Sequence, residues 1–77
     1  MRQTSANVLL YVADIAAGAE RSAIERILAA ERGVLRAWMS PHARSLAIVD
    51  YDPGVTSAPA IRRSVEAQRF TARLVGM

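Results

Sequence analysis

With 77 residues, the chain is long enough for one small hydrophobic core, and we predict a single domain spanning residues 1–77. Its formal net charge is +3 at pH 7, and its ten basic residues, all arginines, are spread along the chain, so charge alone gives little support to nucleic-acid binding. Cysteine is absent, which excludes disulfide bonds and thiolate metal sites, and no stretch reaches the roughly twenty apolar residues of a membrane span, so we expect a cytoplasmic protein.

The first half of the chain predicts a strand followed by a helix. Within residues 7–12, Val8, Leu10 and Val12 recur with the period of a strand, although Leu9 and Tyr11 between them are apolar too. Residues 19–31 place Ile24 and Leu28 on one face of a helix and charged side chains on the other, which indicates an amphipathic helix.

Polar residues and a glycine mark the ends of this helix. If the helix begins late, Ser22 is its N-cap and Glu25, three residues further on, completes a capping box. Gly33 follows the last turn and supplies a C-terminal stop.

The second half of the chain predicts a hairpin, a second helix and a last strand. Residues 34–39 and 46–51 have strand character and are separated by a Pro-His-Ala-Arg turn, so they form a β-hairpin. Ser57 is the predicted N-cap of a helix that runs to about Gln68. Residues 70–75 are the predicted last strand.

The predicted order of elements is strand, helix, strand, strand, helix, strand. This is the ferredoxin-like βαββαβ arrangement of the α+β class. Right-handed crossovers place both helices on one face of a four-stranded antiparallel sheet, so we predict a two-layer sandwich.

Alternation along the strands predicts that the sheet has two largely apolar faces. The face toward the helices takes Val8, Leu10, Val12, Ala37, Met39, Ala47, Val49, Tyr51, Ala72 and Leu74. The opposite face, which we call the outer face, takes Leu9, Tyr11, Arg36, Trp38, Leu46, Ile48, Asp50, Thr71, Arg73 and Val75. Six of these ten outer-face residues are large and apolar, which predicts that a partner covers the outer face.

Three kinds of partner would cover the outer face. They are a second copy of the chain, another domain of a longer protein, and nucleic acid stacking on Tyr11 and Trp38 with arginines alongside. Nucleic acid is the least favoured, because the chain lacks the aromatic-rich motif of RNA-recognition sheets. We therefore expect a protein partner or a homodimer, with an interface of Leu9, Tyr11, Arg36, Trp38, Leu46, Ile48, Arg73 and Val75.

Five groups of residues carry a resemblance to a known family, at that family's spacing and over nearly the whole chain, from about Val8 to Leu74. They are Ile24-Glu25 with Leu28, Gly33-Val34, Ala47-x-Val49-x-Tyr51-Asp52-Pro53, Thr56-Ser57 with Ile61, and Phe70-Thr71-Ala72-Arg73-Leu74. In these groups the chain resembles the heavy-metal-associated domain, the small module of copper and mercury chaperones and of the N-terminal extensions of metal-transporting P-type ATPases. The resemblance implies a metal-transport context for the chain.

The resemblance also implies a metal-binding loop of the form Gly-Met-x-Cys-x-x-Cys ahead of the first helix. In this sequence Ala17 and Glu20 take the two cysteine positions, and Asp14 and Ile15 take the Gly-Met pair. Soft sulfur holds Cu(I), Hg(II) and Zn(II) at such sites, so we expect no metal there and no cofactor. Ile15 is expected to fill the core where the family packs methionine.

One further departure from the family pattern follows the second helix. The family usually has glycine just before the last, aromatic-led strand, and this chain has Arg69. If the backbone there needs a positive φ, the arginine costs about 1 kcal/mol of stability.

These features together predict a degenerate heavy-metal-associated domain that acts as a protein-interaction or regulatory module. The alternative is a carrier that holds a divalent ion through Asp14, Glu20 and His42. Glu20 is more simply a carboxylate at a helix N-terminus, and His42 an exposed turn residue. Residues 13–19 lack the arginine of an acylphosphatase phosphate loop, and no catalytic arrangement of residues is found elsewhere, so we predict no enzymatic activity.

Overall fold

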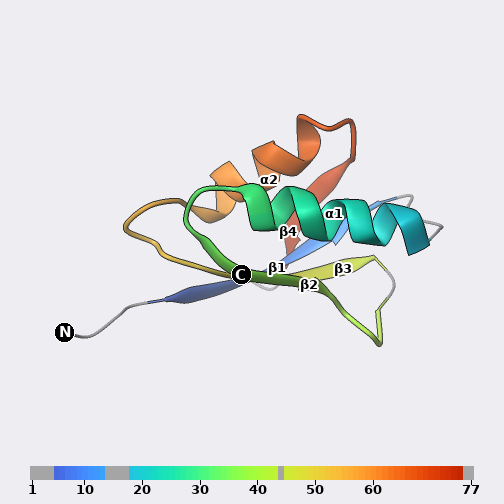
Figure 1. Ribbon diagram of the computed structural model, residues 1–77, viewed down its shortest axis with the longest axis horizontal. Helices are drawn as coiled ribbons and strands as arrows, with labels where there is room; N and C mark the ends of the chain where they lie inside the picture. Colours follow the sequence, from blue (N-terminus) through green and yellow to red (C-terminus); the bar gives the residue numbers. More distant parts are fainter. Residues whose placement is uncertain (1–4, 14–17, 44, 76–77) are drawn as a thin grey trace.

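The computed structural model describes residues 5–13, 18–43 and 45–75 of the chain (Figure 1). Its elements, in order, are β1 (Ala6–Val12), α1 (Gly18–Ala30), β2 (Val34–Met39), β3 (Leu46–Tyr51), α2 (Ala58–Glu66) and β4 (Ala72–Val75). The four strands pair antiparallel in the order β2-β3-β1-β4, and both helices lie on the same side of the sheet. The predicted ferredoxin-like α+β sandwich is therefore confirmed.

The element bounds agree closely with the sequence in the hairpin and less well around the helices. β2 and β3 have the predicted bounds, and the Ser57 hydroxyl caps α2 by accepting a hydrogen bond from the Ala60 amide at 3.3 Å. α1 already begins at Gly18, so Ser22 lies inside the helix and the capping box expected of a late start is wrong. α2 ends at Glu66, earlier than predicted, and β4 begins only at Ala72.

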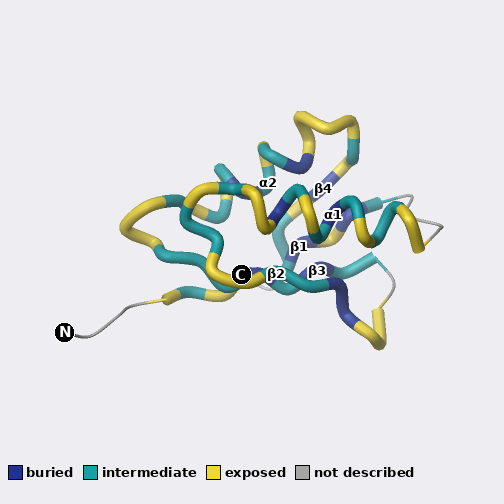
Figure 2. Tube along the Cα trace, in the orientation of Figure 1, coloured by how far each residue is buried: buried dark blue, intermediate teal, exposed yellow. Residues whose placement is uncertain are grey.

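A hydrophobic core fills the space between the sheet and the two helices. Its buried apolar residues are Val8, Leu10, Val12, Ile24, Leu28, Met39, Ala47, Val49, Ile61, Val65 and Ala72. Ala37, Tyr51 and Leu74 are partly buried and pack against this core. Figure 2 shows buried stretches of the helices and of the strands in dark blue, alternating along the helices with exposed stretches in yellow. The predicted helix-facing side of the sheet is thus confirmed.

Polar side chains from α1 attach the end of β2 to the helix layer. A carboxylate oxygen of Glu25 accepts a hydrogen bond from the Met39 amide at 2.9 Å, and the Arg21 guanidinium donates to the Ser40 carbonyl at 3.0 Å. The buried Ser40 hydroxyl in turn accepts from the amides of His42 and Ala43, each at 3.1 Å. These bonds hold residues 40–43 beside the first turns of α1.

Two turns of the backbone use a positive φ. Gly33, between α1 and β2, has a φ of 93°, and a Cβ added there would lie 2.8 Å from the Thr56 methyl carbon, so only glycine fits this position without strain. Arg69, in the turn after α2, has a φ of 72° and is the one non-glycine residue with a positive φ in the described part of the chain. The backbone therefore does use a positive φ where the resemblance implies a glycine.

The two helices are short. In the part of the chain that the structure describes, neither helix combines the length and the apolar composition that crossing a membrane requires.

Candidate interaction surface on the outer face

Cross-strand pairing arranges the side chains of the outer face in three rows. Arg36, Asp50 and Asn7 form the polar row. Trp38, Ile48, Leu9 and Val75 form the apolar row, which runs across all four strands. Leu46, Tyr11 and Arg73 form the mixed row. The apolar row lies between the other two, so the centre of the outer face is apolar and its margins carry the charges.

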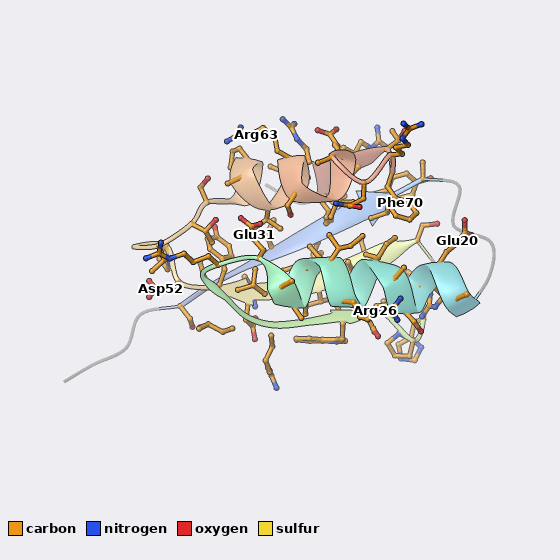
Figure 3. All side chains as sticks on the ribbon, turned by 45° about the horizontal axis from the view of Figure 1, so that its top comes forward. Glu20, Arg26, Glu31, Asp52, Arg63 and Phe70 are labelled. Carbon is orange, nitrogen blue, oxygen red and sulfur yellow. The ribbon has the colours of Figure 1, made fainter. Side chains whose placement is uncertain are left out.

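The side chains of the apolar row are only partly shielded from water. All four are half-buried, because each touches its cross-strand neighbours, but no helix covers them. Tyr11 in the neighbouring mixed row is 37% exposed. In Figure 3, side chains project from the sheet on the side away from both helices. A continuous row of this kind differs from single exposed apolar residues, which are common on any protein surface.

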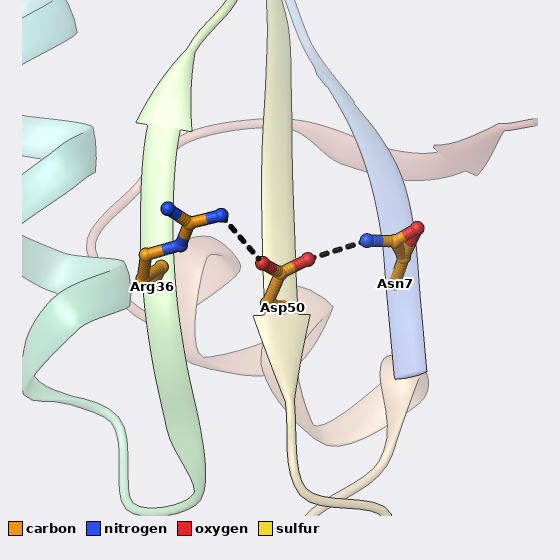
Figure 4. Close-up of polar contacts among 3 residues, drawn as sticks. All are labelled: Asn7, Arg36 and Asp50. Carbon is orange, nitrogen blue, oxygen red and sulfur yellow. Dashed lines mark hydrogen bonds and ion pairs between the residues drawn. The ribbon is translucent and has the colours of Figure 1, made fainter. Parts of the chain in front are cut away.

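Asp50 is the centre of the polar row (Figure 4). One of its carboxylate oxygens pairs with the Arg36 guanidinium at 3.2 Å, and the other accepts a hydrogen bond from the Asn7 side-chain amide. The Arg36 side chain is 70% exposed and that of Asp50 only 19%, so water screens the ion pair and its contribution to stability is small, about 0–1 kcal/mol. The main effect of these contacts is to hold three polar side chains at one margin of the apolar row.

Each large aromatic ring of the outer face lies under an arginine. The Arg36 guanidinium carbon is 4.9 Å from the centre of the Trp38 ring, and that of Arg73 is 5.2 Å from the centre of the Tyr11 ring. Both distances are within the range of cation–π contact. A nucleic-acid base that stacked on either ring would have to displace the arginine or stack on it, so the sheet does not offer open aromatic platforms.

The edges of the sheet are poorly suited to adding another strand. On β2 the pairing shifts between Val34 and Arg36, which leaves Leu35 as an extra residue, 45% exposed, in a β-bulge. On the opposite edge, β4 has only four residues. Bulges and short edge strands are features that discourage edge-to-edge pairing. The outer face is therefore a better candidate for contact than the edges.

The residues considered for metal binding are not gathered by the described part of the fold. Asp14, Ile15 and Ala17 lie outside the described residues. Glu20 is half-buried in the first turn of α1, and His42 is exposed in the turn between β2 and β3. Within residues 5–13, 18–43 and 45–75, no three His, Cys, Asp or Glu side chains come together as a group that could hold a metal ion.

Two features of the sheet were not anticipated from the sequence. Asn7 completes the polar row, and extending the period of two back from Leu9 would have found it. The bulge at Leu35 has no such signal, because Val34–Met39 has the composition of an uninterrupted strand.

No protein-family model matches the sequence, and a search of curated proteins finds no match to it. Solved structures do match. A copper binding domain from HMA7, a P-type ATPase, is 21% identical with a TM-score of 0.84, over 91% of this chain and 93% of that chain. Oxidized MerP from Ralstonia metallidurans CH34 is 15% identical with a TM-score of 0.86, over 95% of this chain and 100% of that chain. The yeast copper transporter domain Ccc2a is 24% identical with a TM-score of 0.78, over 91% and 94% of the two chains. These likenesses establish that the chain has the fold of the heavy-metal-associated domains.

Proposed function

We propose that this chain is a single heavy-metal-associated-type domain that serves a metal-ion transport or homeostasis system by binding a protein through its outer face. In this proposal it does not itself carry a soft metal ion, and it has no catalytic activity. The observation that carries the proposal is the apolar row, which crosses the whole sheet on the side that no helix covers. The metal context rests on the fold, because similar solved structures include a copper binding domain of a P-type ATPase and a yeast copper transporter domain.

The chemistry of the available ligands supports the absence of a soft-metal site. Cu(I) selects thiolate and thioether sulfur, and the chain has no cysteine. Of the three methionines, Met39 lies in the core, where the residue is 5% exposed, and Met1 and Met77 lie outside the described residues. Alanine at position 17 offers no lone pair, and the carboxylate of Glu20 is a hard ligand that suits Mg²⁺ or Ca²⁺ better than Cu(I).

The layout of the outer face matches the general composition of protein interfaces. Such interfaces have an apolar, often aromatic centre surrounded by a polar rim, and arginine is enriched in them while lysine is depleted. The apolar row supplies the centre, with Trp38 as its aromatic anchor. Arg36, Asp50 and Arg73 supply charged groups at the margins, where they can remain partly hydrated.

A competition titration tests the metal part of the proposal. We expect wild-type protein to leave Cu(I) on a coloured Cu(I) chelator, so that the absorbance of the chelate does not change. The double variant Ala17→Cys, Glu20→Cys is the matched positive control, because it restores the two thiols at the family positions and should remove one equivalent of Cu(I). Transfer of one tightly bound Cu(I) to the wild-type chain would contradict the proposal. Failure of the double variant would show that the loop does not keep the family register.

A further inference from the structure

We infer that the partner of the outer face is a second copy of this chain, in a face-to-face dimer whose two-fold axis runs parallel to the strands between β3 and β1. This inference rests on the proposed function and specifies its partner. Its starting point is the position of the rows relative to the strand order β2-β3-β1-β4, in which the middle of the sheet falls between β3 and β1.

A two-fold axis in that position brings each row against the same row of the second copy. It lays β3 over β1 of the partner and β2 over β4 of the partner. In the apolar row, Ile48 then faces the partner's Leu9 and Trp38 faces the partner's Val75. The largest side chain of the row therefore meets one of the smallest, which is the pairing that lets two sheets interdigitate.

The charged residues also fit this axis. The polar row meets the polar row, so Asp50 faces the partner's Asn7, an amide that can donate to a carboxylate. Arg36 lies on β2 in the polar row and Arg73 on β4 in the mixed row, so the axis brings neither guanidinium opposite a guanidinium of the second copy. Because the Arg36 guanidinium lies over its own Trp38 ring at 4.9 Å, it must move toward the polar row for Trp38 to meet the partner's Val75, and it then lies at the rim of the dimer.

A two-fold axis perpendicular to the strands fits less well. It would place the polar row of one copy on the mixed row of the other, so that Asp50 would face the partner's Leu46. A carboxylate pressed against an apolar side chain loses water without gaining a hydrogen bond, which is unfavourable. The arrangement of polar and apolar rows therefore selects the axis parallel to the strands.

The size of the outer face indicates a weak dimer. Four strands about 4.8 Å apart and three rows about 6.8 Å apart give a face of about 400 Å², or about 800 Å² for both copies. Stable protein interfaces bury about 1,200–2,000 Å² in total, so this area suits a reversible contact. We expect a dissociation constant between about 10 μM and about 1 mM.

Sedimentation equilibrium of the full chain over this concentration range tests the inference. We expect the weight-average mass of the wild type to rise from that of the monomer toward twice that value. Ile48→Glu places a carboxylate at the centre of the apolar row and should raise the dissociation constant at least tenfold. Val55→Glu is the matched control, because Val55 is 50% exposed in the turn between β3 and α2, away from the outer face, and should dimerise like the wild type.

An isotope-filtered nuclear Overhauser experiment on a mixture of labelled and unlabelled chains tests the axis. Within one chain, β2 and β4 are three strand spacings apart, about 14 Å, so the Trp38 ring and the Val75 methyl groups are too distant for direct magnetisation transfer. A cross-peak between them therefore comes from the dimer. Its presence supports the axis, and a dimer that lacks it contradicts the axis.

The remaining outcomes separate this inference from the proposed function. A wild type that stays monomeric at 1 mM, or a dimer that Ile48→Glu leaves intact, overturns the inference while the protein-binding function can still hold with another partner. Salt-sensitive binding of a single-stranded oligonucleotide that Trp38→Ala abolishes would assign the outer face to nucleic acid and overturn it as well. Tight Cu(I) binding by the wild type overturns the proposed function whatever the oligomeric state.

Discussion

The two faces of the sheet are both rich in apolar residues, but the chain covers only one of them. Leu10 faces the helices and has no exposed surface, whereas Leu9, the preceding residue on β1, faces outward and is half-buried. Antiparallel sheets with one solvated face usually alternate apolar and polar residues, and β1 does not. The apolar residues of the outer face are therefore not needed to form the core, which favours a role for them in contact with another molecule.

Truncating one leucine on each face should give the largest difference in stability. Leu10→Ala removes a fully buried side chain and should lower the free energy of unfolding by about 2–5 kcal/mol. Leu9→Ala, the matched control, removes the same atoms from a half-exposed site and should cost about 1 kcal/mol or less. Urea unfolding at micromolar protein concentration measures both values for the monomer. Equal losses would mean that the outer face already belongs to a closed core.

Removing a hydrogen bond that attaches α1 to the sheet should have a smaller effect on the free energy of unfolding. Glu25→Ala leaves the Met39 amide without the carboxylate that it bonds at 2.9 Å, so we expect a loss of about 1–2 kcal/mol. Glu66→Ala is the control on α2, where Glu66 forms an exposed ion pair with Arg62 at 3.7 Å worth about 0.3–0.5 kcal/mol. Thermal or urea unfolding compares the two variants. Similar losses would show that the Glu25 bond does not hold α1 to the covered face.

Arg69, in the turn between α2 and β4, has a strained backbone conformation. Relieving this strain should give the smallest change in stability. Arg69→Gly removes the steric penalty of a φ of 72° and should raise the free energy of unfolding by about 1 kcal/mol. Arg69→Ala removes the charge and the long side chain but keeps the Cβ, so it should give no such gain. If the two variants were equally stabilised, the side chain rather than the backbone would be the cause.

The residues of the sheet face that the helices cover could be predicted well from the sequence, because local patterns determine them. Alternation in the strands and the Pro-His-Ala-Arg turn between them gave the bounds of β2 and β3. The helix stripes correctly assigned Ile24 and Leu28 to the core. The outer-face residues followed from the same period of two, since the residues between core positions must point the other way.

The features that sequence patterns missed depend on contacts between distant parts of the chain. Glu25 suggested a local capping box, but its carboxylate bonds the Met39 amide fourteen residues away, a contact that no local pattern encodes. The early end of α2 reflects the turn through Arg69, whose positive φ was suggested by the family resemblance and not by the residue type. The identity of a partner is still harder to predict from sequence. An apolar row indicates that another molecule covers the surface, but it does not indicate which molecule.

The central claim is that a fold known from soft-metal carriers works here through a surface and not through a bound ion. Amide spectra of the ¹⁵N-labelled wild type, recorded under reducing conditions before and after one equivalent of Cu(I), test it most directly. We expect no change in the signals of Val12, Ala13 and Gly18 to Ile24, which flank the family metal loop. Shifts concentrated in these residues, complete at one equivalent, would contradict it.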